Sequence, residues 1–331
     1  MSRLRRHCAL WLLLLAAVGL WYLPAVLTAY PLYVAAMWLV FALCAAGLNL
    51  IMGYAGQVSL AQGAFLGIGA YATALLTAHA GWPWWAAAAF GTLASFVIGL
   101  LLGLAALRVQ HHYLAFITLA FSTLVFLVAR NEVWLTGGVF GIADITRPTL
   151  FGHDLASPAA FFRFVLLAAL VAMLVFWWIV QGPWGLAFAA LRENPLRAES
   201  LGLKVRLYKL FAFGIGSAIA GFAGSLYAPL VQFIDPTSFA VTLSLTLLLT
   251  VVTGGMGYLL GPFVGALISV VVPETLRMTG GYYLIIQAGL VIVLLVACPG
   301  GLLGLLGNLL QWLRNVGRTQ AAPGLEMRAD V

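Results

Sequence analysis

Charged side chains are what this sequence has least of. Asp, Glu, Lys and Arg together make up 8% of the 331 residues, whereas 64% are hydrophobic, and the mean hydropathy is +1.08. Soluble domains carry about 25% charged residues, so a soluble protein is excluded. Continuous apolar runs of about 20 residues recur along the chain, which is the length that a helix needs to cross a bilayer. The predicted fold class is an all-α integral membrane protein.

Carboxylates are absent from the centres of these apolar runs. All nine Asp and Glu residues lie near run ends or in polar loops. Proton-coupled and many ion-coupled carriers bind the driving ion at an ionisable group within the membrane, although backbone carbonyls can also hold Na⁺. A nucleotide-binding G-x-x-x-x-G-K-[ST] loop is missing too, because the only lysines, Lys204 and Lys209, do not follow glycine. We therefore predict no cofactor in this chain, and we expect its energy source to lie in another protein.

Residue patterns for metal binding and catalysis are lacking as well. Cys8, Cys44 and Cys298 lie far apart, in or beside apolar runs, which favours small buried side chains over a disulfide or a metal site. No zincin or G-x-S-x-G pattern occurs. The net charge of +7 comes from basic residues at the ends of apolar runs, where they indicate membrane topology rather than nucleic-acid binding. We predict no metal site, no enzymatic activity and no nucleic-acid partner.

Windows of about 20 apolar residues predict about ten transmembrane or re-entrant helices, with a range of 8–10. Two of these segments, 58–78 and 262–278, are short enough to be re-entrant. With both termini in the cytoplasm, most Lys and Arg residues fall on the cytoplasmic side, and the opposite orientation inverts that bias. The predicted segments are 9–29, 31–52, 58–78, 84–107, 112–130, 160–181, 209–231, 239–257, 262–278 and 282–300.

The chain is predicted to contain one membrane domain, residues 31–313, between two terminal regions. Residues 1–30 begin like a secretory signal, but the apolar run continues without a small-residue cleavage site, which favours an uncleaved first span. Residues 314–331 are polar and are predicted to form a flexible cytoplasmic tail. Within the membrane domain, an external loop rich in turn residues spans 131–159, and a basic cytoplasmic loop spans 182–208.

The cytoplasmic loop 182–208 has the pattern of two capped helices. Pro183 is typical of a helix start. Asn194 as N-cap and Pro195 at the first helical position predict a short helix from Pro195 to Leu201, and Gly202 ends it. An ordinary solvated connector is the alternative, but connectors rarely need two capped helices, which favours a surface for docking another protein. The residues predicted to contribute are Arg192, Glu193, Asn194, Pro195, Arg197, Glu199 and Gly202.

Uncharged polar residues gather in one apolar segment near the N-terminus. Gly53, Gly56, Gln57, Ser59 and Gln62 lie within ten residues of one another. One interpretation is tight helix packing with hydrogen bonds between helices. The other is a helix broken by glycine, whose freed backbone and amides line a translocation pathway. The combination of glycines and amides favours the pathway, and its neutral lining suits zwitterionic or uncharged small solutes.

Five continuous blocks of this sequence form a specific pattern in order along the chain. The blocks are GYAGQVSLAQGAFLGIGAYATALL (53–76), HYLAFITLAFSTLVFLVARNEVWLTGGVFGI (112–142), GLAFAALRENPLRAESLGLKVRLYKLFAF (185–213), AGFAGSLYAPLVQFIDPTSF (220–239) and VVTGGMGYLLGPFVGA (251–266). Together they resemble the permeases of branched-chain amino acid ABC transporters, LivM type, over roughly residues 40–300, with Ala61 and Ser200 where Gly and Ala are more usual in the family. The resemblance also adds Thr136, Gly137 and Gly138, in the TGG loop, to the expected substrate pathway.

The resemblance implies a set of partners and a location. The partners are a LivH-like second permease, two ABC ATPase subunits that bind ATP and Mg, and a periplasmic solute-binding protein, in the lipid bilayer of a bacterial inner membrane. The predicted function is a permease subunit of an ATP-driven importer for branched-chain amino acids or related small solutes. A self-contained channel or secondary carrier for small neutral solutes such as urea or amides is the alternative, and a purely structural membrane subunit is a third interpretation.

Overall fold

The computed structural model describes residues 17–107, 111–150, 153–276, 289, 292–293, 296 and 300–305. Within them the chain is helical except for loops and one antiparallel pair of two-residue strands, β1 (Thr149–Leu150) and β2 (His153–Asp154). The predicted all-helical class is confirmed. The helical elements are η1 (Leu23–Ala25), α2 (Ala29–Asn49), η2 (Leu50–Tyr54), α3 (Gln62–Ala78), α4 (Trp84–Ala106), α5 (His111–Asn131), α6 (Val133–Thr136), η3 (Gly138–Phe140), α7 (Pro158–Gln181), α8 (Pro183–Glu193), α9 (Pro195–Ser200), α10 (Val205–Val231), η4 (Pro236–Phe239), α11 (Val241–Gly254), α12 (Gly261–Ala266), η5 (Leu267–Val271) and α13 (Val272–Leu276).

Five helices in the described part of the chain are long and apolar enough to cross a membrane. Each predicted segment from 31–52 to 262–278 coincides with a helix or with a row of consecutive helices. The last predicted segment, 282–300, lies largely outside the described residues, as do residues 9–16 of the first predicted segment and the whole tail 314–331. The count of ten and the cytoplasmic termini therefore stay predictions. The five long helices are Ala29–Tyr54, Trp84–Ala105, Tyr113–Asn131, Pro158–Gln181 and Val205–Val231.

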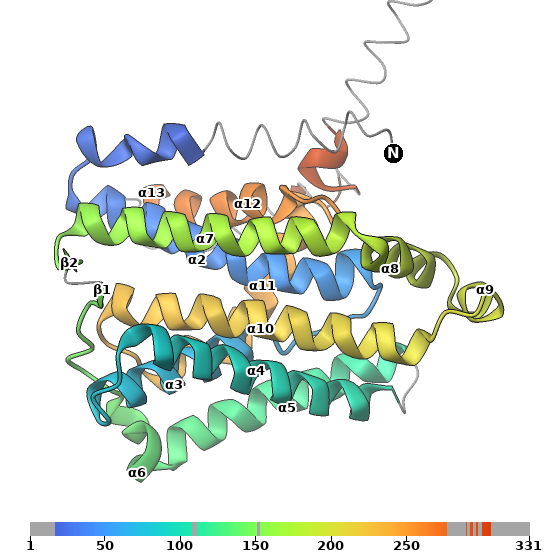
Figure 1. Cartoon of the computed structure of the whole chain (residues 1–331), viewed down its shortest axis with the longest axis horizontal. Helices are drawn as coiled ribbons and strands as arrows, with labels where there is room; N and C mark the ends of the chain where they lie inside the picture. The colour runs from blue at the N-terminus through green and yellow to red at the C-terminus, as the bar shows by residue number, and fades with distance from the viewer. Residues whose placement is uncertain are drawn as a thin grey trace, which may run out of the picture.

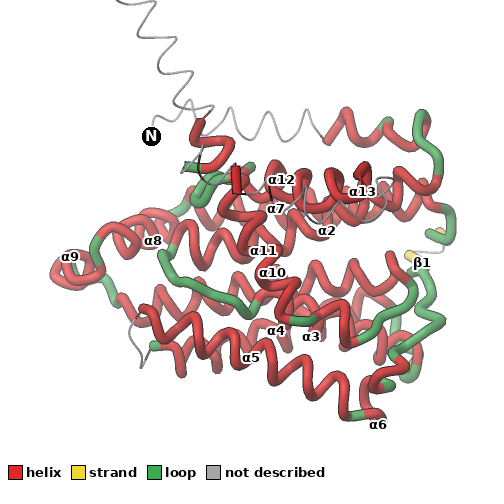
Figure 2. Tube along the Cα trace, turned by 180° about the vertical axis from the view of Figure 1, so that it is seen from behind, coloured by secondary structure: helices red, strands yellow, loops and turns green. Residues whose placement is uncertain are grey.

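The long helices run side by side along the long axis of the molecule (Figure 1). Helices α8 and α9 project beyond the bundle at one end, which we call the α9 end. Helix α6 and the β1–β2 pair lie at the opposite end, the α6 end, and the view from behind shows the same arrangement (Figure 2). At the α6 end, Ile142 and Ile234 form an isolated antiparallel bridge that joins the predicted external loop to the segment after α10.

Helix α10 is the centre of the bundle and packs on α2, α3 and α4. Its approach to α3 is so close that only glycine fits at the crossing. A Cβ atom at Gly69 would lie 2.0 Å from the carbonyl oxygen of Gly221, and one at Gly224 would lie 2.0 Å from that of Leu66. Membrane helices associate through such small-residue contacts because lipid provides no hydrophobic drive between them. The close approach of α3 to α10 therefore depends on glycine at these two positions.

The stretch between η2 and α3, residues 55–61, is not helical although it lies inside the bundle. Ala55, Ser59 and Ala61 are buried. Backbone groups that leave a helix inside a membrane protein need other partners. Here the amide of Leu60 donates to Thr118 Oγ1 at 3.0 Å, and its carbonyl accepts from Ser122 Oγ at 2.7 Å, both from α5. The predicted break in this part of the chain is thus present.

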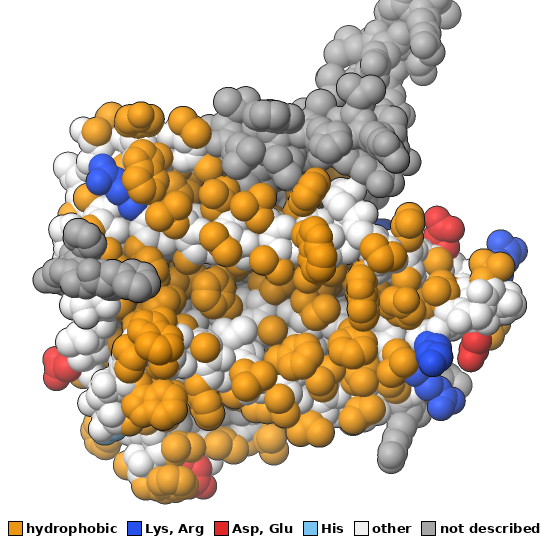
Figure 3. All heavy atoms as spheres, viewed as in Figure 1, with side chains coloured by type: hydrophobic (Ala, Val, Ile, Leu, Met, Phe, Trp, Pro, Cys, Tyr) orange, Lys and Arg blue, Asp and Glu red, His pale blue; other side chains and the backbone are white. Residues whose placement is uncertain are grey.

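The face of the molecule that Figure 3 shows is largely apolar between the two ends. Large side chains on it are well exposed, including Leu101 at 61%, Phe116 at 69% and Val171 at 59%. The densest group of charged side chains lies at the α9 end, and others lie at the α6 end. An apolar belt between two charged ends is the surface expected of a protein that spans a bilayer along its long axis.

Candidate functional site

The α9 end is built by the loop that the sequence predicts as a docking surface. Pro183 opens α8, and the buried residues Phe188 and Leu191 lie on one side of that helix. The ring of Trp184 packs edge-on against those of Tyr208 and Phe211, with centroid distances of 5.3 and 5.5 Å. These aromatic contacts pack α8 against the first turns of α10, so the two helices that flank α9 are held against each other.

The predicted capped helix is present and ends one residue earlier than expected, at Ser200. The Asn194 side chain accepts hydrogen bonds from the amides of Leu196 and Arg197, both at 3.1 Å, which satisfies two donors that the helix itself leaves unpaired. Gly202 follows with φ +85°, a left-handed conformation that stops the helix. Sequence reasoning therefore located this helix and both of its ends.

Two apolar residues that sequence reasoning overlooked stand out at the ends of α9, one in its first turn and one at its C-cap. Leu196 is 78% exposed and Leu201 is 81% exposed, although both are large hydrophobic side chains. Arg197 and Glu199 are exposed between them, whereas Ala198 faces inward and is buried. Both leucines lie in the loop 182–208, next to the predicted helix caps and outside the predicted transmembrane segments, and this position could have identified them as exposed. Glu193, at the end of α8, is also exposed.

Arg192 brings the predicted docking loop into contact with the predicted pathway segment. Arg192 is exposed as a residue, but its Nη1 atom points inward and donates to the carbonyl of Gly53 at 2.6 Å. Gly56, with φ +68°, lies against it, since a Cβ atom there would be 3.4 Å from the Arg192 Cα. Arg192, predicted to contribute to docking, thus contacts Gly53 and Gly56, which are predicted to line the pathway.

The remaining residues of the pathway cluster are buried and bonded to backbone. Gln57 Nε2 donates to the carbonyl of Lys209 at 3.2 Å. Gln62 Nε2 donates to the carbonyls of Cys44 at 3.1 Å and Gly216 at 3.0 Å, and its Oε1 is buried without a partner among the described residues. Ser59 Oγ accepts from the amide of Ala61 at 3.3 Å. These contacts are those of the packing interpretation, and a role in lining a pathway stays a prediction.

Thr136, Gly137 and Gly138 lie apart from this cluster, at the α6 end. The Thr136 hydroxyl donates to the carbonyls of Ala129 at 2.6 Å and Glu132 at 2.9 Å, which fixes the start of the loop. Gly137 lines a cavity of about 540 Å³ together with Thr77, His79, Asp144 and Thr146, among others. The predicted pathway residues therefore divide between the two ends of the molecule.

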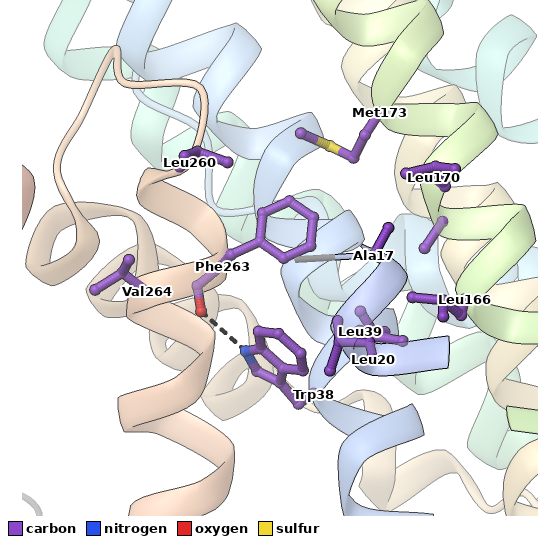
Figure 4. Close-up of a pocket in the computed structure, with 11 residues that line it drawn as sticks. Ala17, Leu20, Trp38, Leu39, Leu166, Leu170, Met173, Leu260, Phe263 and Val264 are labelled. Atoms are coloured by element: carbon purple, nitrogen blue, oxygen red, sulfur yellow. Dashed lines mark hydrogen bonds between the residues drawn. The ribbon is translucent and has the colours of Figure 1, made fainter. Parts of the chain in front are cut away.

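A cavity of about 220 Å³ between α2, α7 and α12 has a different character. Its lining is apolar throughout, as the side chains of Trp38, Met173 and Phe263 show (Figure 4). The two polar groups that Figure 4 marks there are bonded to each other, since the Trp38 indole N–H donates to the Phe263 carbonyl at 2.9 Å. A charged ammonium or carboxylate would lose its hydration here without gaining a partner. This cavity suits hydrocarbon and not a free amino acid.

The sequence was also compared with known protein families. Residues 30–297 match the family model described as branched-chain amino acid transport system, permease component. The chain belongs to this family. It is 33% identical over 325 residues to the high-affinity branched-chain amino acid transport system permease protein LivM of Salmonella typhimurium, covering 91% of this chain and 76% of that protein. It is 34% identical over 293 residues to the LivM protein of Escherichia coli, covering 82% and 69%.

More distant similarity reaches permeases of other solutes. An autoinducer 2 import system permease protein, LsrC of Yersinia pseudotuberculosis, is 26% identical over 220 residues, which cover 63% of this chain and 57% of that protein. No solved structure matches the chain. Family membership together with several long apolar helices makes the chain a multi-pass membrane protein and a permease component of a transport system.

Proposed function

We propose that this chain is the transmembrane permease subunit of an ATP-driven importer for branched-chain amino acids or related small solutes. Family membership supports the transport role. The observation that carries the ATP-driven part is α9, a capped helix that projects from the bundle with two exposed leucines. The chain itself performs no catalysis, and ATP and Mg bind to partner ATPase subunits.

Helix α9 has the properties of a helix that inserts into a groove on another protein. Such interfaces rely on a few apolar anchors surrounded by polar residues. Burying an exposed leucine side chain contributes roughly 1.5–3 kcal/mol, so Leu196 and Leu201 supply the anchors, while Arg197 and Glu199 supply the polar rim. Asn194 and Gly202 hold both ends of the helix, which lowers the conformational entropy lost on docking.

The α9 end is assigned to the cytoplasm. Its basic residues Arg192, Arg197, Lys204 and Arg206 occur together in one loop, and such loops are retained on the inner side of the membrane. The proposal includes both termini on that side, about ten spans, an uncleaved span at 1–30, a membrane domain at 31–313 and a flexible tail at 314–331. The partners are a LivH-like permease, two ABC ATPases and a periplasmic solute-binding protein, in a bacterial inner membrane.

A crosslinking experiment tests the docking of α9. In a background with Cys8, Cys44 and Cys298 replaced by alanine, an Arg197→Cys variant is expected to crosslink to the ATPase subunit in the assembled complex. A Trp134→Cys variant is the matched control, because Trp134 is 81% exposed at the α6 end. It is expected to form no such crosslink. Crosslinking of the control alone, or labelling of the Arg197→Cys variant from the periplasmic side, would contradict the assignment.

A further inference from the structure

Three glycines from two distant parts of the chain lie against Arg192, two of them at its guanidinium and one along its Cα, Cβ and Cγ atoms. Its Nη1 atom donates to the Gly53 carbonyl at 2.6 Å, and a Cβ atom built at Gly257 would lie only 2.7 Å from the same Nη1 atom. A Cβ atom built at Gly56 would lie 3.4–3.6 Å from the Cα, Cβ and Cγ atoms of Arg192. We call Gly53, Gly56 and Gly257 the glycine cradle. Arg192 leaves little room for a Cβ at Gly56 and Gly257, whereas a Cβ at Gly53 would clash with Asn49 Oδ1 at 2.1 Å and with the Gly257 amide nitrogen at 2.5 Å.

The Gly53 carbonyl is made available by the way that α2 ends. The five residues that follow α2, η2 (Leu50–Tyr54), continue it as a π-helical turn. After it, the amide of Gln57 donates to the Ile51 carbonyl at 2.9 Å and not to that of Gly53, four residues before it. A π-turn shifts the hydrogen-bond pattern of a helix in this way and often marks a functional position. Arg192, 139 positions further along the chain, takes up the acceptor.

Asn49 ties the third part of the cradle to the same helix end. Its side-chain amide donates to the Tyr258 carbonyl at 2.9 Å, and its Oδ1 accepts from the Gly257 amide at 2.8 Å. The Asn49 side chain thereby holds the turn between α11 and α12 against α2 through two hydrogen bonds, one to the Tyr258 carbonyl and one from the Gly257 amide. Gly257 has φ +81°, so the turn presents backbone without a side chain to the arginine. Three elements therefore meet at one guanidinium: the end of α8, the π-turn of α2 and the α11–α12 turn.

We propose that Arg192 is a positioning residue that transmits displacements of α8 and α9 to the π-turn after α2 and to the turn between α11 and α12. It acts within this chain rather than at the ATPase surface. The inference rests on the proposed function, since it presumes that α9 docks on an ATPase. Arg192 lies two residues before the N-cap of α9, so movement of α9 moves the guanidinium with little intervening chain. Its charge-assisted hydrogen bond then acts on the pathway segment 53–62 directly.

The test uses the complete complex of permeases, ATPases and binding protein, with leucine as the solute. Arg192→Gln is expected to leave co-purification of the ATPase subunits unchanged, because the Arg192 guanidinium bonds to Gly53 within this chain. Stimulation of hydrolysis by leucine-loaded binding protein, and leucine uptake, are expected to fall by about 5- to 150-fold, the usual range of coupling between two sites. Arg192→Lys, which keeps a cation and one donor, is expected to restore part of the loss.

Two further variants separate transmission from a general effect of charge or folding. Gly257→Ala is expected to displace the guanidinium and reproduce the Arg192→Gln phenotype, and the double variant is expected to lose no more than either single one, because both break one contact. Arg206→Gln, which removes an exposed cation at the same end of the molecule outside the cradle, is expected to behave as wild type.

The outcomes that overturn the inference are distinct from failure of the proposed function. Loss of ATPase co-purification in Arg192→Gln would make Arg192 an interface contact, and wild-type stimulation in that variant would remove its role. A lower melting temperature of the Arg192→Gln complex with a proportional loss of basal hydrolysis would show a merely structural contact. In each case the wild-type complex still transports leucine with ATP, whereas absence of that activity would overturn the proposed function itself.

Discussion

Replacing Gly202 by valine is expected to abolish stimulation of the partner ATPase while the permease still inserts and assembles. Gly202 has φ +85°, and no atom lies within 4 Å of a Cβ built there. The variant therefore suffers no clash, and its only penalty is the left-handed backbone, which a β-branched residue adopts at a cost on the order of 1–3 kcal/mol. Relief of that strain unwinds the end of α9 and misplaces Leu201, one of its two apolar anchors.

The measurement is ATP hydrolysis by the assembled complex, with and without solute-loaded binding protein. Gly202→Asn is the matched control, because asparagine adopts the left-handed conformation more readily than other non-glycine residues. We expect it to retain most of the stimulation. If valine and asparagine have equal effects, the left-handed conformation of Gly202 does not determine the position of α9. That result would contradict the proposal that Gly202 positions α9 for docking on the ATPase.

Replacing Gly69 by valine is expected to prevent α3 from packing on α10. A Cβ atom at this position would lie 2.0 Å from the Gly221 carbonyl oxygen and 2.7 Å from the Gly221 Cα, so the two backbones must separate. Overpacking of a close contact costs on the order of 1–3 kcal/mol, and here the neighbour is backbone that has no rotamer to change. Since α10 also packs on α2 and α4, the disturbance spreads to the centre of the bundle.

Thermal unfolding in detergent and the yield of monodisperse protein report this effect. Gly19→Val serves as the control, because Gly19 is an exposed helical glycine with nothing within 4 Å of its would-be Cβ. It is expected to match wild type, whereas Gly69→Val is expected to melt at a clearly lower temperature or to aggregate. Equal melting temperatures for the two variants would contradict the close approach of α3 and α10.

The features that follow from local sequence were predictable. Long apolar runs determine where a helix crosses a bilayer, so the segments between 31–52 and 262–278 could be assigned from hydropathy alone. The Asn194–Pro195 pair has a backbone meaning that does not depend on the rest of the fold, and it identified the start of α9 correctly. The five family blocks are continuous stretches of sequence, so they indicate the transport function without knowledge of which helices pack together.

The features that depend on distant partners were not predictable from a single sequence. The π-turn at Leu50–Tyr54 leaves no pattern in the side chains. The inward direction of the Arg192 side chain depends on Gly53 and Gly257, which lie 139 and 65 positions away in the sequence. Gln57 and Gln62 are amides that serve equally well as pathway lining or as hydrogen bonds between helices. Their hydrogen bonds to backbone on α2 and α10 can be seen only in the folded structure. The same reasoning overlooked Leu196 and Leu201, because an apolar residue is unremarkable in a chain that is 64% hydrophobic.

The most direct test of the central claim is uptake of radiolabelled leucine by proteoliposomes that contain this chain with its second permease, two ATPases and binding protein. We predict uptake only when ATP is enclosed at the ATPase face, unchanged by a protonophore that collapses ion gradients. Uptake by this chain alone, driven by a proton or sodium gradient without ATP, would contradict an ATP-driven permease and favour a self-contained carrier.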